Sequence, residues 1–131
     1  MAHSTTPFLM FEGKAREAMS FYVSLFKRSE ILLDEAWKVG DLGRPGLIKR
    51  GEFSLNGQRF ICFDSPVHHD FQFTPSISLF VECESESELD TVFQQLSEGG
   101  QILMPLGNYG FSTKFGWLND RFGVSWQLNL T

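Results

Sequence analysis

The feature that most constrains the fold of this chain is an order of predicted elements that occurs twice in its 131 residues. A short apolar run at 7–12 is followed by a segment with a helical period at 14–27 and by three runs with strand character. A strand at 76–82 and a helix that begins after Ser85 open the second half, and three strand-like runs complete it. We therefore predict two tandem βαβββ modules, at about 6–66 and about 75–131, joined by a linker at about 67–74.

Local signals mark several boundaries of these elements. Asn56-Gly57 is typical of a two-residue type I′ hairpin. Ser85 and Glu88 have the spacing of a capping box, and Gly99-Gly100 ends the helix that follows. The strands predicted after the two helices are 31–37, 51–55, 58–63, 101–106, 111–118 and 124–130.

Charge and cysteine content narrow the function classes. Eleven Lys and Arg against sixteen Asp and Glu give a formal net charge of -5, so we expect no nucleic-acid partner. Cys62 and Cys83 each lie in an apolar run, as buried reduced thiols of a cytoplasmic protein do. No apolar run approaches the roughly 20 residues of a membrane span, and the N-terminus lacks a signal-peptide pattern. We expect a soluble, cytoplasmic protein with no membrane partner.

The alternation along the strands predicts a ligand cleft. In the last strand, Trp126 and Leu128 alternate with Ser125, Gln127 and Asn129, and the aliphatic face belongs against a helix. The other face mixes small polar residues with aromatic ones, as the lining of a ligand cleft does, where a solvated face would carry charges.

The fourteen phenylalanines can be divided between the core and such a cleft. We expect one group to pack helices against sheets, namely Phe8, Phe21, Phe26 and Phe93. We expect another to line the cleft or a dimer interface, namely Phe11, Phe60, Phe80 and Phe111.

Three blocks of the sequence carry a family resemblance. They are TPFLMFEGKAREAMSFYVSLFKRSEI at 6–31, FTPSISLFVECESESELDTVFQQLSEGG at 73–100 and GWLNDRFGVSWQL at 116–128. Together they resemble the PhnB-like branch of the vicinal oxygen chelate (glyoxalase and bleomycin-resistance) superfamily, and within it the proteins labelled 3-demethylubiquinone-9 3-methyltransferase-like. The resemblance implies an α+β fold in which both modules build a curved, open-barrel mixed sheet with the helices outside. It also implies a homodimer and, in active relatives, a metal inside the barrel.

The implied metal ligands are missing from this sequence. The metal-dependent relatives take His or Glu from the first and last strands of each module, and the corresponding positions here hold Pro7 or Phe8, Cys62, Ser76 and Gln127. The best donors that this set offers to a divalent ion are the thiol of Cys62 and the carboxylate of Asp64, two residues further on. We therefore expect no metal and no other cofactor, and a divalent metal is the disfavoured alternative.

The methyltransferase label is not supported by a sequence motif. A site for S-adenosylmethionine usually includes a glycine-rich turn from a strand into a helix. The glycine-dense loops at 40–46 and 107–110 do not have that position.

The candidate catalytic residues are Cys62, Asp64 and His68. Cys62 could be a nucleophile or a small buried thiol. The His68-His69-Asp70 run could supply an acid–base group or an adventitious metal site, or it could be part of an exposed linker.

The predicted ligand-binding residues are aromatic or weakly polar: Trp37, Phe60, Cys62, Ser76, Ser78, Tyr109, Phe111, Trp117 and Gln127. The aromatic members could also pack in the core or at a dimer interface. Three functions remain open. The first is a metal-free small-molecule-binding protein, and the second is a lyase, dioxygenase, thiol transferase or methyltransferase with an altered metal site. The third is an interaction module without a ligand.

Overall fold

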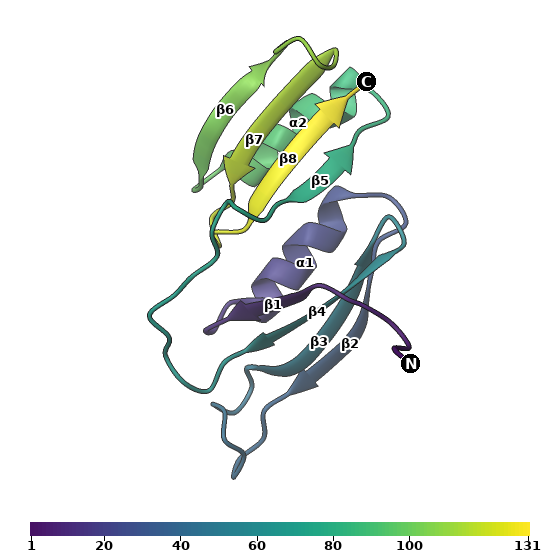
Figure 1. The fold of residues 1–131 in the computed structure, drawn as a ribbon. Coiled ribbons are helices and arrows are strands. Elements are labelled where there is room, and N and C mark those ends of the chain that lie inside the picture. The colour runs from purple at the N-terminus through teal and green to yellow at the C-terminus, as the bar shows by residue number, and fades with distance from the viewer. The chain divides into compact units, whose positions relative to one another are not determined.

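The structure, a computed structural model, describes residues 1–131 and shows the strand-helix-strand-strand-strand order twice (Figure 1). The chain forms two compact units, Met1–His69 and Asp70–Thr131. The first contains β1 (Phe8–Phe11), α1 (Ala15–Leu25), β2 (Glu30–Ala36), β3 (Ile48–Leu55) and β4 (Gln58–Asp64). The second contains β5 (Leu79–Glu82), α2 (Glu86–Ser97), β6 (Gln101–Gly107), β7 (Lys114–Asn119) and β8 (Ser125–Leu130). The predicted α+β class and the repeated βαβββ order are confirmed.

The two sheets have the same topology. Their strand orders are β1-β4-β3-β2 and β5-β8-β7-β6, so the first strand of each unit lies beside the last. That pair is parallel and the other pairs are antiparallel, which makes both sheets mixed. Neither sheet closes into a barrel, because each has two edge strands.

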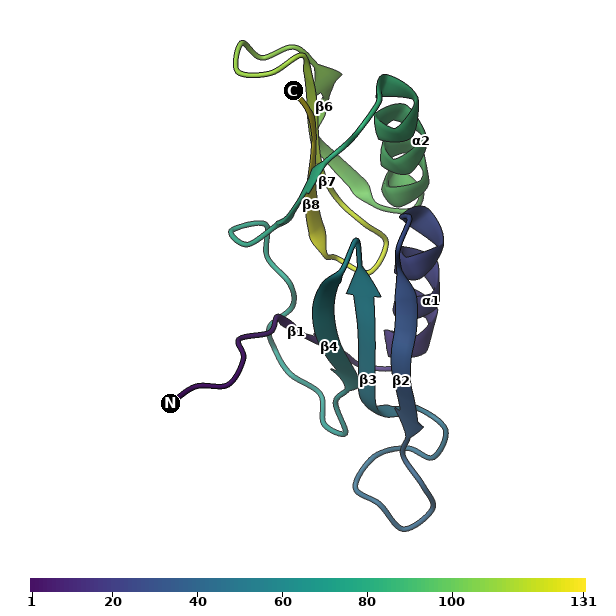
Figure 2. The same ribbon diagram turned by 90° about the vertical axis from the view of Figure 1, so that its right-hand side faces the viewer.

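In the first unit, α1 covers one face of its sheet (Figure 2). Met19 and Tyr22 of the helix are fully buried, and the Tyr22 ring lies 6.2 Å from that of Phe53. Gly51 of β3 allows this close approach, since a Cβ atom there would stand 2.7 Å from Cys62 Sγ and 3.0 Å from Met19. The core of this unit therefore lies between α1 and the middle strands.

In the second unit, α2 begins where the sequence predicts. Ser85 Oγ accepts a hydrogen bond from Glu88 N at 3.1 Å, and a Glu88 carboxylate oxygen accepts one from Glu84 N. Phe93 and Leu96 are among the buried residues of the helix. A Cβ atom on Gly116 of β7 would stand 2.4 Å from the Phe93 ring, so this glycine lets α2 pack closely on its sheet.

The Asn56-Gly57 hairpin is also confirmed. Both residues have positive φ, 51° and 86°, as a type I′ turn requires. The hairpin joins β3 to β4 and pairs Leu55 with Gln58. It thereby fixes which residues of the two strands share a face.

Several predicted positions are wrong. Phe8 was expected in the core but is 54% exposed, whereas Phe11 is buried, because the second and fourth residues of β1 are those that turn toward α1. β5 begins at Leu79, three residues after the predicted start, and Ile77 is exposed in the segment before it. β7 begins at Lys114, so that Phe111 lies in the preceding turn.

No helix of the structure has both the length and the apolar character needed to cross a membrane.

Candidate functional site

The candidate site is the face of the second sheet that is turned away from α2. Lys114 and Gly116 identify the α2 side, because Lys114 Nζ contacts Glu86 and Asp90 of the helix and Gly116 lies under Phe93. The alternate residues of β7, and their partners in the register, therefore form the opposite face. We call this set the C-terminal open face; it consists of Ser78, Phe80, Glu82, Phe115, Trp117, Asn119, Ser125, Gln127 and Asn129.

The middle row of the C-terminal open face places an amide between two aromatic side chains. The register pairs Gln127 with Trp117 on one side and with Phe80 on the other. Phe80 is 58% exposed, and Gln127 and Trp117 are half-buried, so a small molecule can reach the row. No hydrogen bond of the structure involves the Gln127 side chain, which leaves its carbonyl and NH₂ groups available to a ligand.

Hydroxyl groups form the next row. Ser78 Oγ and Ser125 Oγ are 2.7 Å apart, and the indole Nε1 of Trp117 donates to Ser125 Oγ at 2.9 Å. Ser125 is buried and Ser78 is half-buried. The hydrogen bond fixes the plane of the Trp117 ring, so that this side of the site is rigid before any ligand binds.

At the other end, the open face combines an aromatic cluster with a carboxylate. The rings of Tyr109 and Phe111 lie 6.2 Å and 5.0 Å from that of Phe115. Glu82 accepts a hydrogen bond from Asn129 Nδ2 and two from Thr131. These hydrogen bonds, with that of Asn129 foremost, lower the pKa of the Glu82 carboxyl group and keep it ionised.

Two buried oxygen atoms on the open face lack a partner: Asn119 Oδ1 and Asn129 Oδ1. Asn129 Nδ2 donates to Glu82, and this bond sets the orientation of the amide. A buried acceptor without a donor costs about 1–3 kcal/mol, and most native proteins contain few of them. Their position on the face that carries the candidate site indicates a surface suited to a donor.

Five of the predicted ligand-binding residues lie on this face or beside it, namely Ser78, Tyr109, Phe111, Trp117 and Gln127. Ser76 does not share their row. It is exposed in the segment before β5, where its Oγ is 2.7 Å from Thr74 Oγ1. Ser76 continues the alternation of residues along β5, but β5 begins at Leu79 and does not include it.

Three other predicted ligand-binding residues belong to the first unit, and two of them turn toward α1. The Phe60 ring stacks on that of Phe53 at 5.1 Å, and Cys62 Sγ lies beside Gly51 and Met19. Both side chains are buried. The expectation that Cys62 faces a cleft is therefore wrong, because the odd-numbered residues of β4, and not the even-numbered ones, face away from the helix.

The third, Trp37, is half-buried directly after β2. Its Nε1 donates to the backbone oxygen of Asp64 at 3.1 Å, and Gly43 packs so closely on its ring that no Cβ atom would fit. The indole thus holds the 38–46 loop against the end of β4.

Two of the candidate catalytic residues, Cys62 and Asp64, are buried within the first unit. Burial, with the Asp64 carboxylate as a lesser cause, raises the pKa of the Cys62 thiol to about 12, so this thiol is protonated at neutral pH. The Asp64 carboxylate is buried and accepts hydrogen bonds from the backbone N–H groups of Gly13, Ala15 and Ile48. Those hydrogen bonds satisfy backbone N–H groups at the N-terminus of α1 and at the start of β3.

His68 lies on the surface, apart from these buried groups. Its side chain is 80% exposed, and its Nδ1 is 2.8 Å from Glu12 Oε1. The neighbouring His69 donates its backbone N–H to Glu12 Oε2, and its Nε2 is 3.0 Å from Ser65 Oγ. These contacts join the segment after β4 to the end of β1.

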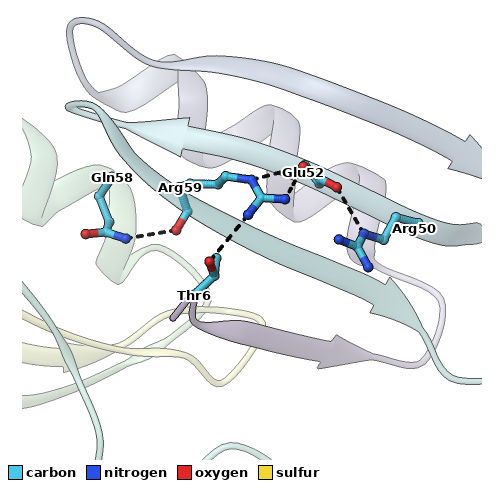
Figure 3. Close-up of polar contacts among 5 residues, drawn as sticks. All are labelled: Thr6, Arg50, Glu52, Gln58 and Arg59. Atoms are coloured by element: carbon cyan, nitrogen blue, oxygen red, sulfur yellow. Dashed lines mark hydrogen bonds and ion pairs between the residues drawn. The ribbon is translucent and has the colours of Figure 1, made fainter. Parts of the chain in front are cut away.

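The first sheet carries a charged network that the sequence prediction missed. Arg50, Glu52 and Arg59 lie on the face turned away from α1, and their ion pairs run across β3 and β4 (Figure 3). We call this face the N-terminal open face; it consists of Phe8, Met10, Arg50, Glu52, Ser54, Arg59, Ile61 and Phe63. The Asn56-Gly57 turn fixes the register of these strands and could have predicted the network.

The residues present do not fit the metal that the superfamily implies. The open-face residues of the first and last strands of the N-terminal unit are Phe8, Met10, Arg59, Ile61 and Phe63, and none has a side chain that binds a hard or borderline divalent ion. No group of three or more His, Cys, Asp or Glu residues in the 131 described residues is arranged to hold a metal ion.

The repeated βαβββ topology defines a protein of the vicinal oxygen chelate fold. A glyoxylase/bleomycin resistance protein/dioxygenase domain from Frankia sp. EAN1pec shares this fold with a TM-score of 0.65 at 13% identity, covering 99% of this chain and 98% of its own. The model of the 3-demethylubiquinone-9 3-methyltransferase family matches residues 3–129, and the chain belongs to this family.

Two solved structures are more similar to this chain. A PhnB protein from Bacillus cereus is 56% identical with a TM-score of 0.96, covering 98% of this chain and 100% of its own. A protein from Pseudomonas aeruginosa is 28% identical with a TM-score of 0.80, covering 98% of both chains. No curated protein matches the sequence. The chain is thus a PhnB-like member of the 3-demethylubiquinone-9 3-methyltransferase family, with the vicinal oxygen chelate fold.

The family description names a methyl transfer, but the usual glycine-rich strand-to-helix turn is not found. The connection from β1 to α1 contains Gly13 alone, and the connection from β5 to α2 contains no glycine.

Proposed function

We propose that this protein binds a small aromatic molecule on its C-terminal open face and does so without a metal. The observation that carries the proposal is the middle row, in which the free amide of Gln127 lies between Trp117 and Phe80. An aromatic ligand can pack on the exposed Phe80 ring while it exchanges hydrogen bonds with the amide. The unpaired Asn129 Oδ1 favours a ligand that also carries an N–H or O–H donor.

The metal-free part of the proposal is supported by the donor set. The N-terminal open face presents apolar side chains at the positions that the superfamily uses for ligands. On the C-terminal open face, the Glu82 carboxylate already accepts hydrogen bonds from Asn129 and Thr131. A metal bound to Glu82 would have to displace those donors, and no imidazole lies beside this carboxylate as a further ligand.

A homodimer is part of the same proposal. Phe8 of the first unit and Ile77, Phe80 and Phe111 of the second are each more than half exposed, and large exposed apolar side chains can belong to contact or ligand surfaces. Light scattering after size exclusion is expected to give twice the 14.9 kDa mass of one chain. A monomeric mass at micromolar concentration would contradict this part.

The ligand test uses small aromatic probes with and without donors. Phenol, hydroquinone, aniline and anisole are titrated into ¹⁵N-labelled protein while the Trp117 indole and Gln127 amide signals are followed. We expect the donor-bearing probes to shift both signals and to raise the melting temperature, because a ligand that binds only the folded state stabilises it. Anisole is expected to bind more weakly.

A pair of variants tests the role of the amide. Gln127→Leu keeps the side-chain volume and removes the amide, and we expect it to weaken phenol or hydroquinone binding about 3-fold to 10-fold. The matched control is Gln95→Leu on the exposed side of α2, which is expected to leave binding unchanged. Failure of every probe to shift the signals, or equal binding by both variants, would overturn the proposed site.

Metal analysis of protein purified without chelator separates this proposal from a metal enzyme. We expect no stoichiometric transition metal. A stoichiometric metal that remains bound to the folded protein after dialysis would contradict the metal-free proposal.

A further inference from the structure

We propose that the N-terminal open face has a second binding site, for an organic molecule that carries one carboxylate or phosphate group on an apolar body. Arg50 would bind the oxyanion through the free end of its guanidinium group, with Arg59 beside it. The proposal rests on residues of the first unit alone.

The first observation concerns the charges of Arg50, Glu52 and Arg59. Two arginines share one carboxylate, that of Glu52. Arg59 donates Nε at 3.0 Å and Nη2 at 2.6 Å to Oε1, and Arg50 donates Nε at 3.0 Å to Oε2 (Figure 3). The carboxylate therefore holds both guanidinium groups in place but neutralises only one of them. Its pKa is lowered by these hydrogen bonds, chiefly those of Arg59.

The second observation is which N–H groups remain free. Arg16 of the same unit differs, because each of its three guanidinium nitrogens has an acceptor: Nε and Nη2 donate to Asp34, and Nη1 donates to the Gly46 oxygen. Arg50 donates only through Nε. Its Nη1 and Nη2 groups have no protein partner, and its side chain is 44% exposed. The terminal edge of a guanidinium group matches a carboxylate or phosphate with two parallel hydrogen bonds.

The third observation is the apolar surface beside this edge. The register pairs Glu52 with Ile61 on this face, and Arg50 and Phe63 each follow the same alternation two residues further along their strands. The Phe63 ring lies 5.2 Å from that of Phe8, which is 54% exposed. A ligand bound to Arg50 can therefore pack its apolar body on these rings, and a bare inorganic anion cannot.

One acidic residue limits the charge of the ligand. The register pairs Glu35 of β2 with Arg50, and no ion pair joins them. Directly paired residues of neighbouring strands lie on the same face, so the Glu35 carboxylate repels an anion at Arg50, but it accepts no hydrogen bond from that guanidinium group. A singly charged oxyanion is favoured for this reason over a multiply charged one.

The test compares four probes by NMR, following the Arg50 and Arg59 Nε–H signals of ¹⁵N-labelled protein. Benzoate and phenyl phosphate carry the oxyanion on an aromatic body, acetate lacks the body, and benzyl alcohol lacks the charge. We expect benzoate to bind at millimolar concentration or tighter, and acetate to bind at least about 5-fold more weakly. Comparison with phenyl phosphate identifies which oxyanion is preferred. Acetate binding as well as benzoate, or an equal response to benzyl alcohol, would overturn the proposal.

The variants use matched charge changes. We expect Arg50→Gln to weaken benzoate binding about 10-fold or more, because charge-assisted hydrogen bonds are lost. Arg44→Gln makes the same charge change in an exposed loop and is expected to alter binding less than about 2-fold. Glu35→Gln removes the repulsion and is expected to tighten binding about 2-fold.

Arg50→Lys tests the geometry, since it keeps the charge and loses the planar edge; we expect binding between that of wild type and Arg50→Gln. Circular dichroism verifies the fold of each variant. The proposal fails if Arg50→Gln and Arg44→Gln bind benzoate equally well, or if wild-type protein shows no saturable shift of the Arg50 signal with either aromatic anion.

Discussion

The two units share a topology but differ in what their open faces offer to a ligand. The N-terminal open face carries Arg50, Glu52 and Arg59 beside aromatic side chains, whereas the middle of the C-terminal open face carries the neutral groups of Gln127 and Trp117. On the helix side the two units remain alike, with a glycine under each helix. Packing constrains the helix side, and the open face can therefore diverge without loss of the fold.

Each unit also contains one buried aspartate, and the two aspartates stabilise different parts of the structure. Asp64 joins segments that are distant in sequence, since it accepts hydrogen bonds from Gly13 and Ile48 N–H groups. Asp120 acts within the hairpin between β7 and β8, where it accepts from Phe122 N, Val124 N and Trp126 Nε1. The first carboxylate replaces a missing helix cap, and the second closes a turn.

The largest predicted effect tests this difference. Asp64→Ala and Asp120→Ala each leave three donors without their acceptor, and we expect each to lower the free energy of unfolding by about 3–5 kcal/mol in urea titrations. Hydrogen exchange locates the loss, which we expect at the start of α1 and of β3 for Asp64→Ala. For Asp120→Ala we expect it in the β7–β8 hairpin.

The control is Asp41→Ala, which removes one exposed hydrogen bond to Lys38 N and is expected to cost less than about 1 kcal/mol. If Asp64→Ala were as mild as this control, or if exchange rose in the same residues for both variants, the distinction between the two aspartates would be wrong.

The second prediction compares the glycines under the helices. Gly116→Ala places a Cβ atom against the Phe93 ring, and Gly51→Ala places one against Cys62 Sγ and the flexible Met19 side chain. An aromatic ring has less freedom to move than a methionine, so we expect Gly116→Ala to cost about 2–3 kcal/mol and Gly51→Ala about 1 kcal/mol.

Chemical denaturation of both variants measures the two costs. Gly40→Ala is not a suitable control because Gly40 has positive φ. Gly116→Ser offers a second reading, since it adds a slightly larger group at the same place and should be at least as destabilising. A smaller cost for Gly116→Ala than for Gly51→Ala would mean that α2 can shift on its sheet more easily than α1.

The start of α2 was predictable from sequence, and the start of α1 was only partly so. Ser85 caps α2 from the adjacent residue, and such a local pattern can be read directly. Lys14, at the corresponding position of α1, makes no side-chain cap, and the Asp64 carboxylate supplies the acceptor from 49 residues away. A contact of that kind follows from the sheet order, which the sequence alone does not specify.

The orientation of β4 shows why part of the site was missed. Each set of alternate residues along this strand contains a phenylalanine and one more apolar residue, Cys62 or Ile61, so hydrophobicity did not decide which set faces α1. Cys62 was placed on the wrong face for that reason. β8 has a clear contrast between Leu128 and Gln127, and there the predicted open face agrees with the structure.

The last prediction concerns two carboxyl groups, one on each open face. Glu52 is held by guanidinium groups and Glu82 by neutral donors, and both pKa values lie below the usual 4.5. A lowered pKa means that the ionised group contributes stability above that usual value, and that this contribution is lost as the pH falls through the lowered pKa. We expect both groups to titrate below pH 4.5 when their side-chain ¹³C signals are followed by NMR.

Salt separates the two cases. Screening weakens the attraction between Glu52 and the two exposed arginines, so the pKa of Glu52 should rise as NaCl increases from about 0.05 M to about 0.5 M. The hydrogen bonds from Asn129 and Thr131 to Glu82 involve no cation, and its pKa should change less. Arg59→Gln should raise the pKa of Glu52 alone, because Arg59 is the chief cause of its shift. An equal change of both pKa values with salt would contradict the prediction. It would show that the ion pairs of Glu52 are too weak to distinguish the N-terminal open face from the C-terminal open face.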